Sequence, residues 1–200
     1  MNHRGFFICL EGIDGCGKTT QARMLVNSLN KMGYRAIYTV EPSRGKIGSF
    51  IKRYCLHRDK RISSIVEALL FAADRVEHLG NEVIPAIMEG KIVVSDRYLF
   101  SSLAYQGAAG LDINWIRKIN EYAIKPDLAI FIDVDPEVAI KRLKTIKSVM
   151  ENLENEIKVR EIYLKLVESG DLIRVDGNRS KREVAKEILH LTLSALKKIK

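Results

Sequence analysis

Residues 12–19, Gly-Ile-Asp-Gly-Cys-Gly-Lys-Thr, have the types and spacing that can surround a chain of phosphate groups. They match the pattern G-x-x-x-x-G-K-[ST] without a mismatch. The glycines at 12, 15 and 17 can adopt positive φ angles, so that successive amides point toward phosphate oxygens. Lys18 can then reach the outer phosphates, while the Thr19 hydroxyl can ligate Mg²⁺. We expect a nucleotide-binding loop formed by Gly12, Ile13, Asp14, Gly15, Cys16, Gly17, Lys18, Thr19 and Thr20.

The elements on either side of this loop are those that such a site needs. Residues 6–10 are an unbroken apolar run, which predicts the central strand of a parallel sheet, buried on both faces. After the loop, five apolar residues recur at helical spacing: Ala22, Leu25, Val26, Leu29 and Met32. Gly33 follows as a C-terminal cap. The order of strand, loop and helix favours a phosphate site over a glycine turn with a surface lysine.

Two further strand ends carry charged side chains. The apolar run 92–96 ends in Asp96, and an acid beside a phosphate loop is placed to hold Mg²⁺ and its waters. We favour this role over that of a helix cap; Arg97 follows directly. The run 36–40 predicts another strand, broken by a proline and a glycine. Arg44 therefore lies at a carboxyl-terminal sheet edge, where it either meets an anion or stays a solvated loop residue.

A helix is predicted near the middle of the chain by a stripe of six apolar residues: Ile62, Ile65, Val66, Leu69, Ala73 and Val76. Phe71 and Arg75 lie off this stripe, four residues apart on a shared face, and could act together. From the spacing alone, packing is favoured over ligand stacking for Phe71. Tyr105 and Gln106 lie in a glycine-containing segment that by itself indicates no role.

The rest of the chain completes the pattern of strands alternating with helices. Runs at 128–132 and 172–175 predict two more strands, and helices are expected near Pro85, over 115–123 and at the C-terminus. Asp135, before Pro136, is expected to be an N-cap. The charged stretch 141–160 is expected to be a solvated, movable helical flap. We predict an α/β fold with a doubly wound parallel sheet of about five strands, in a single domain over 1–200.

Composition narrows the class of protein. The chain has 200 residues and a formal net charge of +8, which suits polyanionic nucleotides. Because the basic residues are spread widely, a nucleic-acid surface is the lesser alternative. The three cysteines lack C-x-x-C spacing and predict reduced thiols, and the four histidines show no metal spacing. With no signal peptide and no apolar run of about 18 residues, we expect a cytoplasmic protein that does not span a membrane.

Four segments in this order resemble thymidylate kinases, a family of P-loop nucleoside monophosphate kinases, over nearly the whole chain. They are residues 11–21, Glu41-Pro42 with Arg44, the run 69–75, and 96–98 with 105–107. The resemblance implies transfer of the γ-phosphoryl group of ATP to dTMP, with Mg²⁺, by a homodimer. Because the acceptor is already an anionic phosphate oxygen, no general base is needed. Catalysis then reduces to alignment and charge neutralisation.

The same resemblance implies how the thymine base is bound. Phe71 would stack on the base, which revises the packing role that its spacing favours. Arg75 would hydrogen-bond a thymine carbonyl group, and Gln106 would contact the edge of the base. Glu41 belongs to the loop segment expected to line the dTMP site.

For the rest of dTMP, the resemblance assigns Arg97 and Arg44 to the acceptor phosphate. Asp14 would contact the deoxyribose hydroxyl group, and the Tyr105 ring would leave no space for a ribose 2′-hydroxyl. Together with Lys18, the expected catalytic residues are Asp96 and Arg97.

The chain departs from the family pattern inside the loop. Many members carry an arginine where this chain has Gly15, and others use a basic lid instead. In this chain the flap at 141–160 corresponds to that lid, and it has Lys144 and Lys147 where an arginine is expected. Either lysine is therefore a candidate catalytic cation. Lys18 with Mg²⁺ alone is the equally weighted alternative. A related deoxynucleotide or deoxynucleoside kinase, a P-loop ATPase and a nucleic-acid-binding module stay open, although Phe71 and Gln106 favour the thymidylate kinase.

Overall fold

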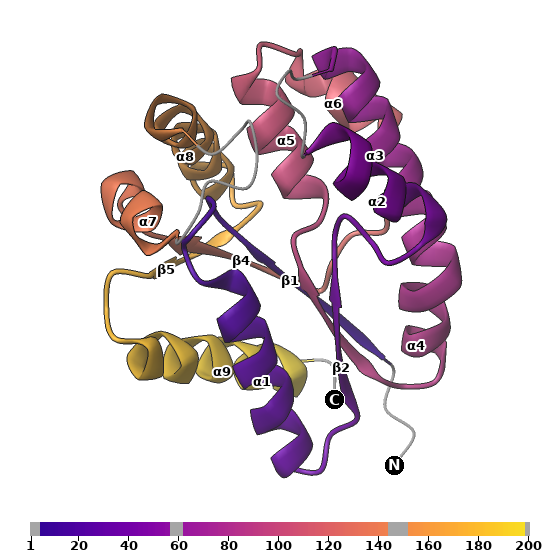
Figure 1. Ribbon diagram of the computed structural model, residues 1–200. Helices are drawn as coiled ribbons and strands as arrows, with labels where there is room; N and C mark the ends of the chain where they lie inside the picture. The colour runs from indigo at the N-terminus through magenta and orange to yellow at the C-terminus, as the bar shows by residue number, and fades with distance from the viewer. Residues whose placement is uncertain (1–4, 57–61, 144–151, 199–200) are drawn as a thin grey trace.

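The computed structural model describes residues 5–56, 62–143 and 152–198, which form a parallel sheet covered by helices on both faces (Figure 1). The five strands lie in the order β2-β3-β1-β4-β5, with all pairs parallel. They are β1 (Phe6–Glu11), β2 (Ala36–Val40), β3 (Ile92–Asp96), β4 (Leu128–Asp133) and β5 (Ile173–Asp176). All five predicted strands are confirmed, with β1 at the centre as expected.

Helices cover both faces of the sheet, which is why β1, β3 and β4 are buried along their whole length. Helices α1 (Lys18–Lys31) and α9 (Lys181–Lys197) pack together on one face (Figure 1). The other face carries α3 (Ser64–His78), α4 (Ile84–Met88), α5 (Leu99–Ala108) and α8 (Leu153–Glu168). The shorter helical segments are α2 (Lys46–Phe50), η1 (Ile51–Cys55), η2 (Leu79–Val83), α6 (Ile113–Ile119) and α7 (Pro136–Arg142).

The strand register brings three loops to one edge of the sheet. Leu10 on β1 and Val40 on β2 both pair with Asp96 at the end of β3. The backbone continues this alignment, since Glu41 N donates to Asp96 O and Arg97 N donates to Leu10 O, each at 3.0 Å. The glycine loop and the segments beginning at Glu41 and Arg97 therefore leave the sheet side by side.

Local signals set several helix ends. Gly33, just past α1, has φ 86°, as expected for a helix cap. Asp135 is the predicted N-cap of α7, and its side chain accepts a hydrogen bond from Glu137 N at 2.9 Å. The helix expected over 115–123 instead spans α6 and ends at Ile119. The side chain of Asn120 donates to Ile116 O at 2.8 Å, and such bonds compete with continuation of a helix.

The apolar stripe of α3 faces outward instead of into the protein. Ile65, Val66, Leu69 and Val76 are about half exposed, at 51, 49, 48 and 50%. The inward face of α3 is polar, with Glu67, Asp74, Arg75 and His78 buried beside two alanines. This inversion reflects a polar site beneath α3, where the helix supplies hydrogen-bonding groups in place of apolar ones.

The flap expected over 141–160 is only partly as predicted. Lys141 and Arg142 end α7, and residues 153–160 are helical, but Glu156 and Val159 are fully buried. This end of α8 packs against α5, so it is not a solvated surface. Over the described ranges, no helix combines the length and the apolar character that crossing a membrane requires.

Candidate active site

The glycine loop joins β1 to α1 and has the backbone geometry expected from its sequence. Gly12, Gly15 and Gly17 have φ angles of 147°, 79° and 98°. A Cβ atom at Gly12 would lie 2.8 Å from Ile132 O, and one at Gly15 would lie 2.2 Å from Ala139 O. Both neighbours are backbone atoms, so a larger residue at either position would require the chain to move.

Lys18 lies inside this loop, where its side chain is buried. Its Nζ donates to Gly12 O at 2.9 Å and to Ile13 O at 2.8 Å. Cys16 Sγ lies 3.7 Å from the same nitrogen. Burial raises the pKa of the Cys16 thiol, which agrees with a space-filling role for this residue and not a nucleophilic one. All three cysteines are buried thiols.

Two oxygen ligands of the kind that Mg²⁺ prefers lie together at the end of β3. The Thr19 hydroxyl donates to Asp96 Oδ2, and Tyr38 OH donates to the same oxygen at 3.3 Å. These residues fit a hard cation that takes its remaining ligands from phosphate and water. Among the described residues, no group of three or more His, Cys, Asp and Glu side chains could hold a metal by itself.

Arg97 connects the glycine loop to α5. It has φ 74°, an uncommon value for a residue other than glycine. Its Nη2 forms an ion pair with Asp14 Oδ1, and its Nη1 donates to Gly12 O at 3.3 Å and to Ser101 Oγ at 3.0 Å. Burial acts to raise the pKa of Asp14, but Arg97 and Lys18 outweigh it and hold that pKa below its ordinary value.

Tyr105 and Glu156 complete this part of the site. The Arg97 guanidinium lies over the Tyr105 ring, 5.0 Å from its centroid. Glu156 Oε2 accepts from Tyr105 OH at 3.3 Å and from Asp14 N at 3.2 Å. Burial, together with the Asp14 carboxylate, raises the pKa of Glu156 to about 7. No prediction from the sequence included Glu156, although a glutamate in line with Val159 and Tyr163 on a buried helix face is a signal for such a site.

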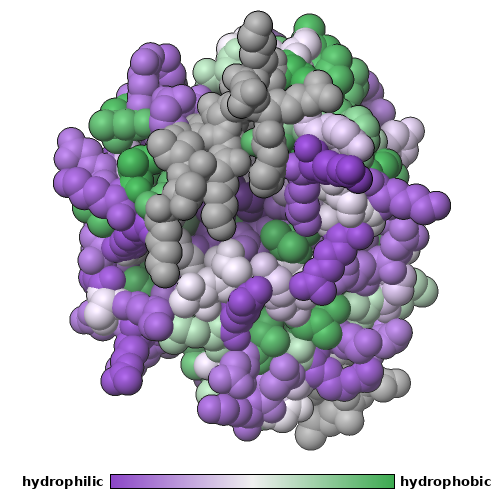
Figure 2. All heavy atoms as spheres, viewed as in Figure 1, coloured by the Kyte–Doolittle hydropathy of each residue, from purple (hydrophilic) through white to green (hydrophobic). Residues whose placement is uncertain are grey.

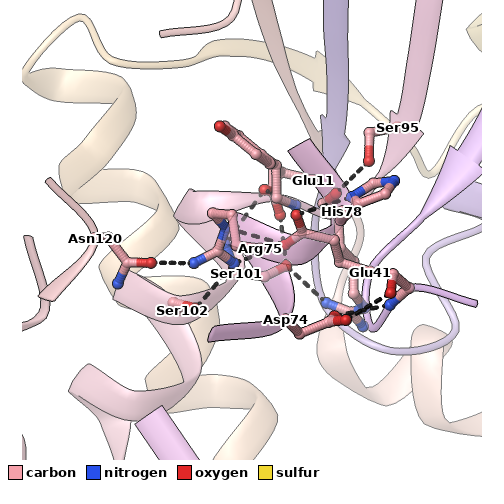
Figure 3. Close-up of polar contacts among 12 residues, drawn as sticks. Glu11, Glu41, Asp74, Arg75, His78, Ser95, Ser101, Ser102 and Asn120 are labelled. Atoms are coloured by element: carbon pink, nitrogen blue, oxygen red, sulfur yellow. Dashed lines mark hydrogen bonds and ion pairs between the residues drawn. The ribbon is translucent and has the colours of Figure 1, made fainter. Parts of the chain in front are cut away.

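A second polar network surrounds Arg75 (Figure 3). Arg75 Nη2 donates to Glu41 Oε2 at 2.7 Å and to Ser102 Oγ at 3.1 Å, and its Nη1 donates to Asn120 Oδ1. Both Arg75 and Glu41 are buried. Glu41 Oε1 also lies 3.2 Å from His78 Nδ1. The arginine expected to contact a base is therefore held rigidly, and the sequence did not reveal Asn120, Ser102 or His78 as its neighbours.

The other residues expected to bind dTMP occupy the same side of the sheet. Phe71 lies one helical turn before Arg75 on α3 and is half-buried. Gln106 Nε2 donates to Glu67 Oε1 at 3.0 Å, whereas its buried Oε1 has no hydrogen-bond partner among the described residues. Gln106 thus retains an acceptor that a ligand N–H could satisfy if the side chain shifts.

Arg44 is exposed in the loop after β2. That loop is held by Asp74, which accepts from Ser43 N at 2.8 Å and from Ser43 Oγ at 2.6 Å. Lys52 adds a bond from its Nζ to Ser43 O at 2.9 Å. Asp74 precedes Arg75 on α3, so one helix turn positions both the arginine expected to contact the base and the Arg44 loop. The sequence did not show this arrangement.

A cavity of about 220 Å³ opens beside the glycine loop. It lies between the start of α1, the end of α7 and the start of α9, and its lining includes Gly17, Thr20, Arg142 and Arg179. Gln21 Nε2 donates to Lys181 O at 3.1 Å and so ties α1 to α9 at the cavity wall. The sequence did not reveal Arg142 or Arg179 as neighbours of the glycine loop. Lys144 and Lys147 lie outside the described residues.

The parallel sheet, the glycine loop and the Thr19–Asp96 contact define a P-loop nucleotide-binding protein of the kinase type. A family model described as thymidylate kinase matches residues 10–188, and the chain belongs to the thymidylate kinase family.

Relatives named for this activity cover nearly the whole chain. A "Probable thymidylate kinase" of Pyrococcus horikoshii is 45% identical over 179 residues, covering 86% of this chain and 87% of the relative. Another of that name, from Staphylothermus marinus, is 41% identical over 198 residues and covers 97 and 98%. A "Thymidylate kinase" of Halothermothrix orenii is 39% identical over 198 residues and covers 94 and 96%.

Proposed function

We propose that this protein transfers the γ-phosphoryl group of ATP to dTMP, giving dTDP and ADP. Family membership supports this reaction, and one contact carries the argument within the structure. The Arg97–Asp14 ion pair places an arginine suited to an acceptor phosphate directly against the phosphate-binding loop. The two phosphate groups that must react would therefore meet where Arg97 lies against the glycine loop.

The donor phosphates would lie in the glycine loop, on its backbone amides and Lys18. Thr19 and Asp96 would hold Mg²⁺, which when bound neutralises charge on the donor phosphates. Lys18 would exchange its bonds with the Gly12 and Ile13 carbonyl groups for phosphate oxygens. Because the acceptor is already an anion, the chain needs no general base and supplies alignment and positive charge.

The cavity beside the loop suits the base of ATP. It adjoins Gly17 and Thr20, next to the expected position of the triphosphate. Its volume is below that of a pocket that encloses a whole drug-sized ligand, so it suits the base alone. Arg142 and Arg179 are at its wall, and planar guanidinium groups stack on aromatic faces.

The acceptor base would lie beneath α3. Phe71 would stack on thymine, Arg75 would donate to a carbonyl group and Gln106 would contact the base edge. Glu41 supports this role by holding Arg75. Arg44 would reach the acceptor phosphate with Arg97.

Sugar recognition would fall to two residues at the glycine loop. Asp14 would accept a hydrogen bond from the deoxyribose hydroxyl group, and Tyr105 would exclude a ribose 2′-hydroxyl. Lys144 or Lys147 would supply the cation that Gly15 cannot.

A panel of acceptors tests this function directly. With ATP and Mg²⁺, we expect rapid formation of dTDP from dTMP, with slower or no reaction of dCMP, dGMP and thymidine. Phosphorylation of thymidine would instead indicate a deoxynucleoside kinase. ATP consumption that is equally fast without any acceptor would indicate an ATPase, and either result would overturn the proposal.

The outward apolar face of α3, defined by Ile65, Val66, Leu69 and Val76, supports a homodimer. Figure 2 shows hydrophobic surface among polar side chains at the upper right, in the region of the upper end of α3 in Figure 1. Residues of this kind exposed along one helix face are typical of an interaction surface. A second copy would bury this α3 face and steady the helix that carries Phe71 and Arg75.

A cytoplasmic location stays a prediction.

A further inference from the structure

Asp14, Arg97, Tyr105 and Glu156 form a closed ring of contacts next to the glycine loop. Glu156 contacts Asp14 N at 3.2 Å and Tyr105 OH at 3.3 Å. Arg97 forms an ion pair with Asp14 and lies over the Tyr105 ring. The members come from the glycine loop, the β3–α5 junction, α5 and α8. Segments far apart in the sequence are thus held as one unit.

Glu156 is the one member of this ring that has no role in the proposed reaction. Its side chain is fully buried, and it lies on the α8 face that also buries Val159 and Tyr163. If this position served only to fill the core, an apolar residue would be sufficient. A buried carboxyl group lowers stability unless hydrogen bonds or charges compensate for its desolvation. The two groups that donate to Glu156 both belong to the site. This points to a role there and not in general packing.

We propose that Glu156 is a positioning residue that fixes the Tyr105 phenol and the loop backbone at Asp14 relative to each other. The inference rests on the proposed function, in which Tyr105 excludes a ribose 2′-hydroxyl. A ring that shifts by on the order of 1 Å would make room for such a group. Discrimination between deoxyribose and ribose therefore depends on a side chain from α8 as well as on Tyr105.

The geometry distinguishes between replacements of Glu156. A single oxygen, Oε2, accepts both from Asp14 N and from Tyr105 OH. The amide oxygen of Glu156→Gln can retain both bonds, whereas Glu156→Leu, of similar size, retains neither. Val159→Ala is the matched control, because Val159 is equally buried on α8 but is apolar.

Protonation of Glu156 gives a second readout. The groups that face it are the Asp14 carboxylate, which disfavours its charge, and Lys18 and Arg97, which favour it. Its other neighbour is the Tyr105 phenol. A protonated carboxyl group turns one acceptor oxygen into a donor, so the contact with Tyr105 changes as the pH passes through neutrality. The amide in Glu156→Gln does not titrate.

The experiment measures kcat/KM for dTMP and for ribothymidine 5′-monophosphate, with saturating ATP and Mg²⁺, and takes their ratio. We expect Glu156→Leu to lower this ratio about fivefold to tenfold, the size of one or two hydrogen bonds. At about pH 6, where Glu156 is protonated and resembles the amide, Glu156→Gln should stay within about twofold of wild type. Val159→Ala should stay within about twofold of wild type at every pH. The wild-type ratio should vary between about pH 6 and about pH 8, and the Glu156→Gln ratio should not.

An unchanged ratio in Glu156→Leu, or an equal fall in Glu156→Gln at about pH 6, would overturn the inference. If Glu156→Leu does not fold, a wild-type ratio that is constant over the same pH range would overturn it. Calorimetric affinities for the two monophosphates provide an independent measure of discrimination, in binding and without turnover. Absence of dTDP formation by the wild type would instead count against the proposed function, so the two failures are distinguishable.

Discussion

Arg75 and Glu41 form a buried ion pair, in which Nη2 and Nε of the arginine donate to the same carboxylate oxygen at 2.7 and 3.1 Å. Their side chains are only 1 and 3% exposed. The pair joins the centre of α3 to the loop that follows β2. An arginine expected to contact thymine is thus positioned by an acid from the loop after β2, so recognition of the base is expected to be linked to stability.

Replacement of Arg75 should affect both properties. Arg75→Ala should raise KM for dTMP at least about tenfold, with KM for ATP nearly unchanged, since the two nucleotides are proposed to occupy different pockets. It should also lower the free energy of unfolding by about 3–5 kcal/mol, because the Glu41 carboxylate is left buried without its partner. Steady-state kinetics and urea denaturation measure the two effects.

The double variant Arg75→Ala/Glu41→Gln separates them. Removing the unpaired charge should restore part of the stability but none of the affinity for dTMP. If KM for dTMP recovers together with stability, Arg75 acts only through folding.

Lys18→Ala should lower turnover by about 100-fold or more, which corresponds to roughly 2.7 kcal/mol of transition-state stabilisation. The reason is that Lys18 is the buried cation of the glycine loop. Rates at saturating ATP and dTMP measure this effect, and circular dichroism checks folding. Near-normal turnover in a folded Lys18→Ala protein would show that the loop lysine is dispensable.

Glu156 should make stability depend on pH. Its pKa is raised from 4.5 to about 7 by burial and by Asp14, so folding favours its protonated form. The stabilisation is therefore fully present below about pH 4.5 and is lost as the pH rises through about 7. Glu156→Gln, which mimics the protonated form, should gain unfolding free energy relative to wild type between about pH 5 and about pH 8, by at most about 3 kcal/mol.

Denaturation at a series of pH values measures this difference. Glu154→Gln is the control on the same helix, since Glu154 is exposed and pairs with Lys158. Its difference from wild type should stay flat over the same range. Parallel curves for wild type and Glu156→Gln would show that Glu156 does not change protonation in this range.

Charges on the outward face of α3 should dissociate the proposed homodimer. In Val66→Lys/Leu69→Lys, two half-exposed apolar side chains would become cations facing their copies in the second subunit. Sedimentation should give twice the chain mass for wild type and the single mass for this variant. Met88→Lys is the control, because Met88 is 83% exposed on α4 and outside the α3 face. A monomeric wild type, or a variant that stays dimeric, contradicts the proposal.

The lid lysines are tested by single-turnover rates at saturating ATP and dTMP. Because charge that spreads over the transferred phosphoryl group must be met by fixed cations, we expect Lys144→Ala, Lys147→Ala or their double variant to slow the chemical step. Wild-type rates in all three would leave Lys18 and Mg²⁺ as sufficient cations. A fall in ATP affinity alone would show that the lid binds nucleotide without stabilising the transition state.

The sequence by itself determined the strands, the glycine loop and the N-cap at Asp135. These depend on local patterns: unbroken apolar runs make buried strands, and glycine at 12, 15 and 17 permits the positive φ angles that the loop shows. The order of the elements was sufficient to predict a parallel sheet, because parallel strands need helical crossovers. The unbroken apolar run of β1 predicted its place at the centre of that sheet. The spacing of residues on α3 also predicted that Phe71 and Arg75 share a face.

Only the tertiary structure decided which side chains meet. Glu156 is 142 residues from Asp14, and no pattern in the chain predicts that contact. The outward turn of the α3 stripe depends on the polar partners that Glu41 and Asn120 bring to Arg75 from other elements. Gly15 is a further example. The sequence shows that this position lacks the arginine that many family members carry. Only the tertiary structure shows that a Cβ atom there would lie 2.2 Å from Ala139 O on α7. Local structure depends on residues that are neighbours in the sequence, whereas contacts between side chains depend on how segments that are distant in the sequence pack together.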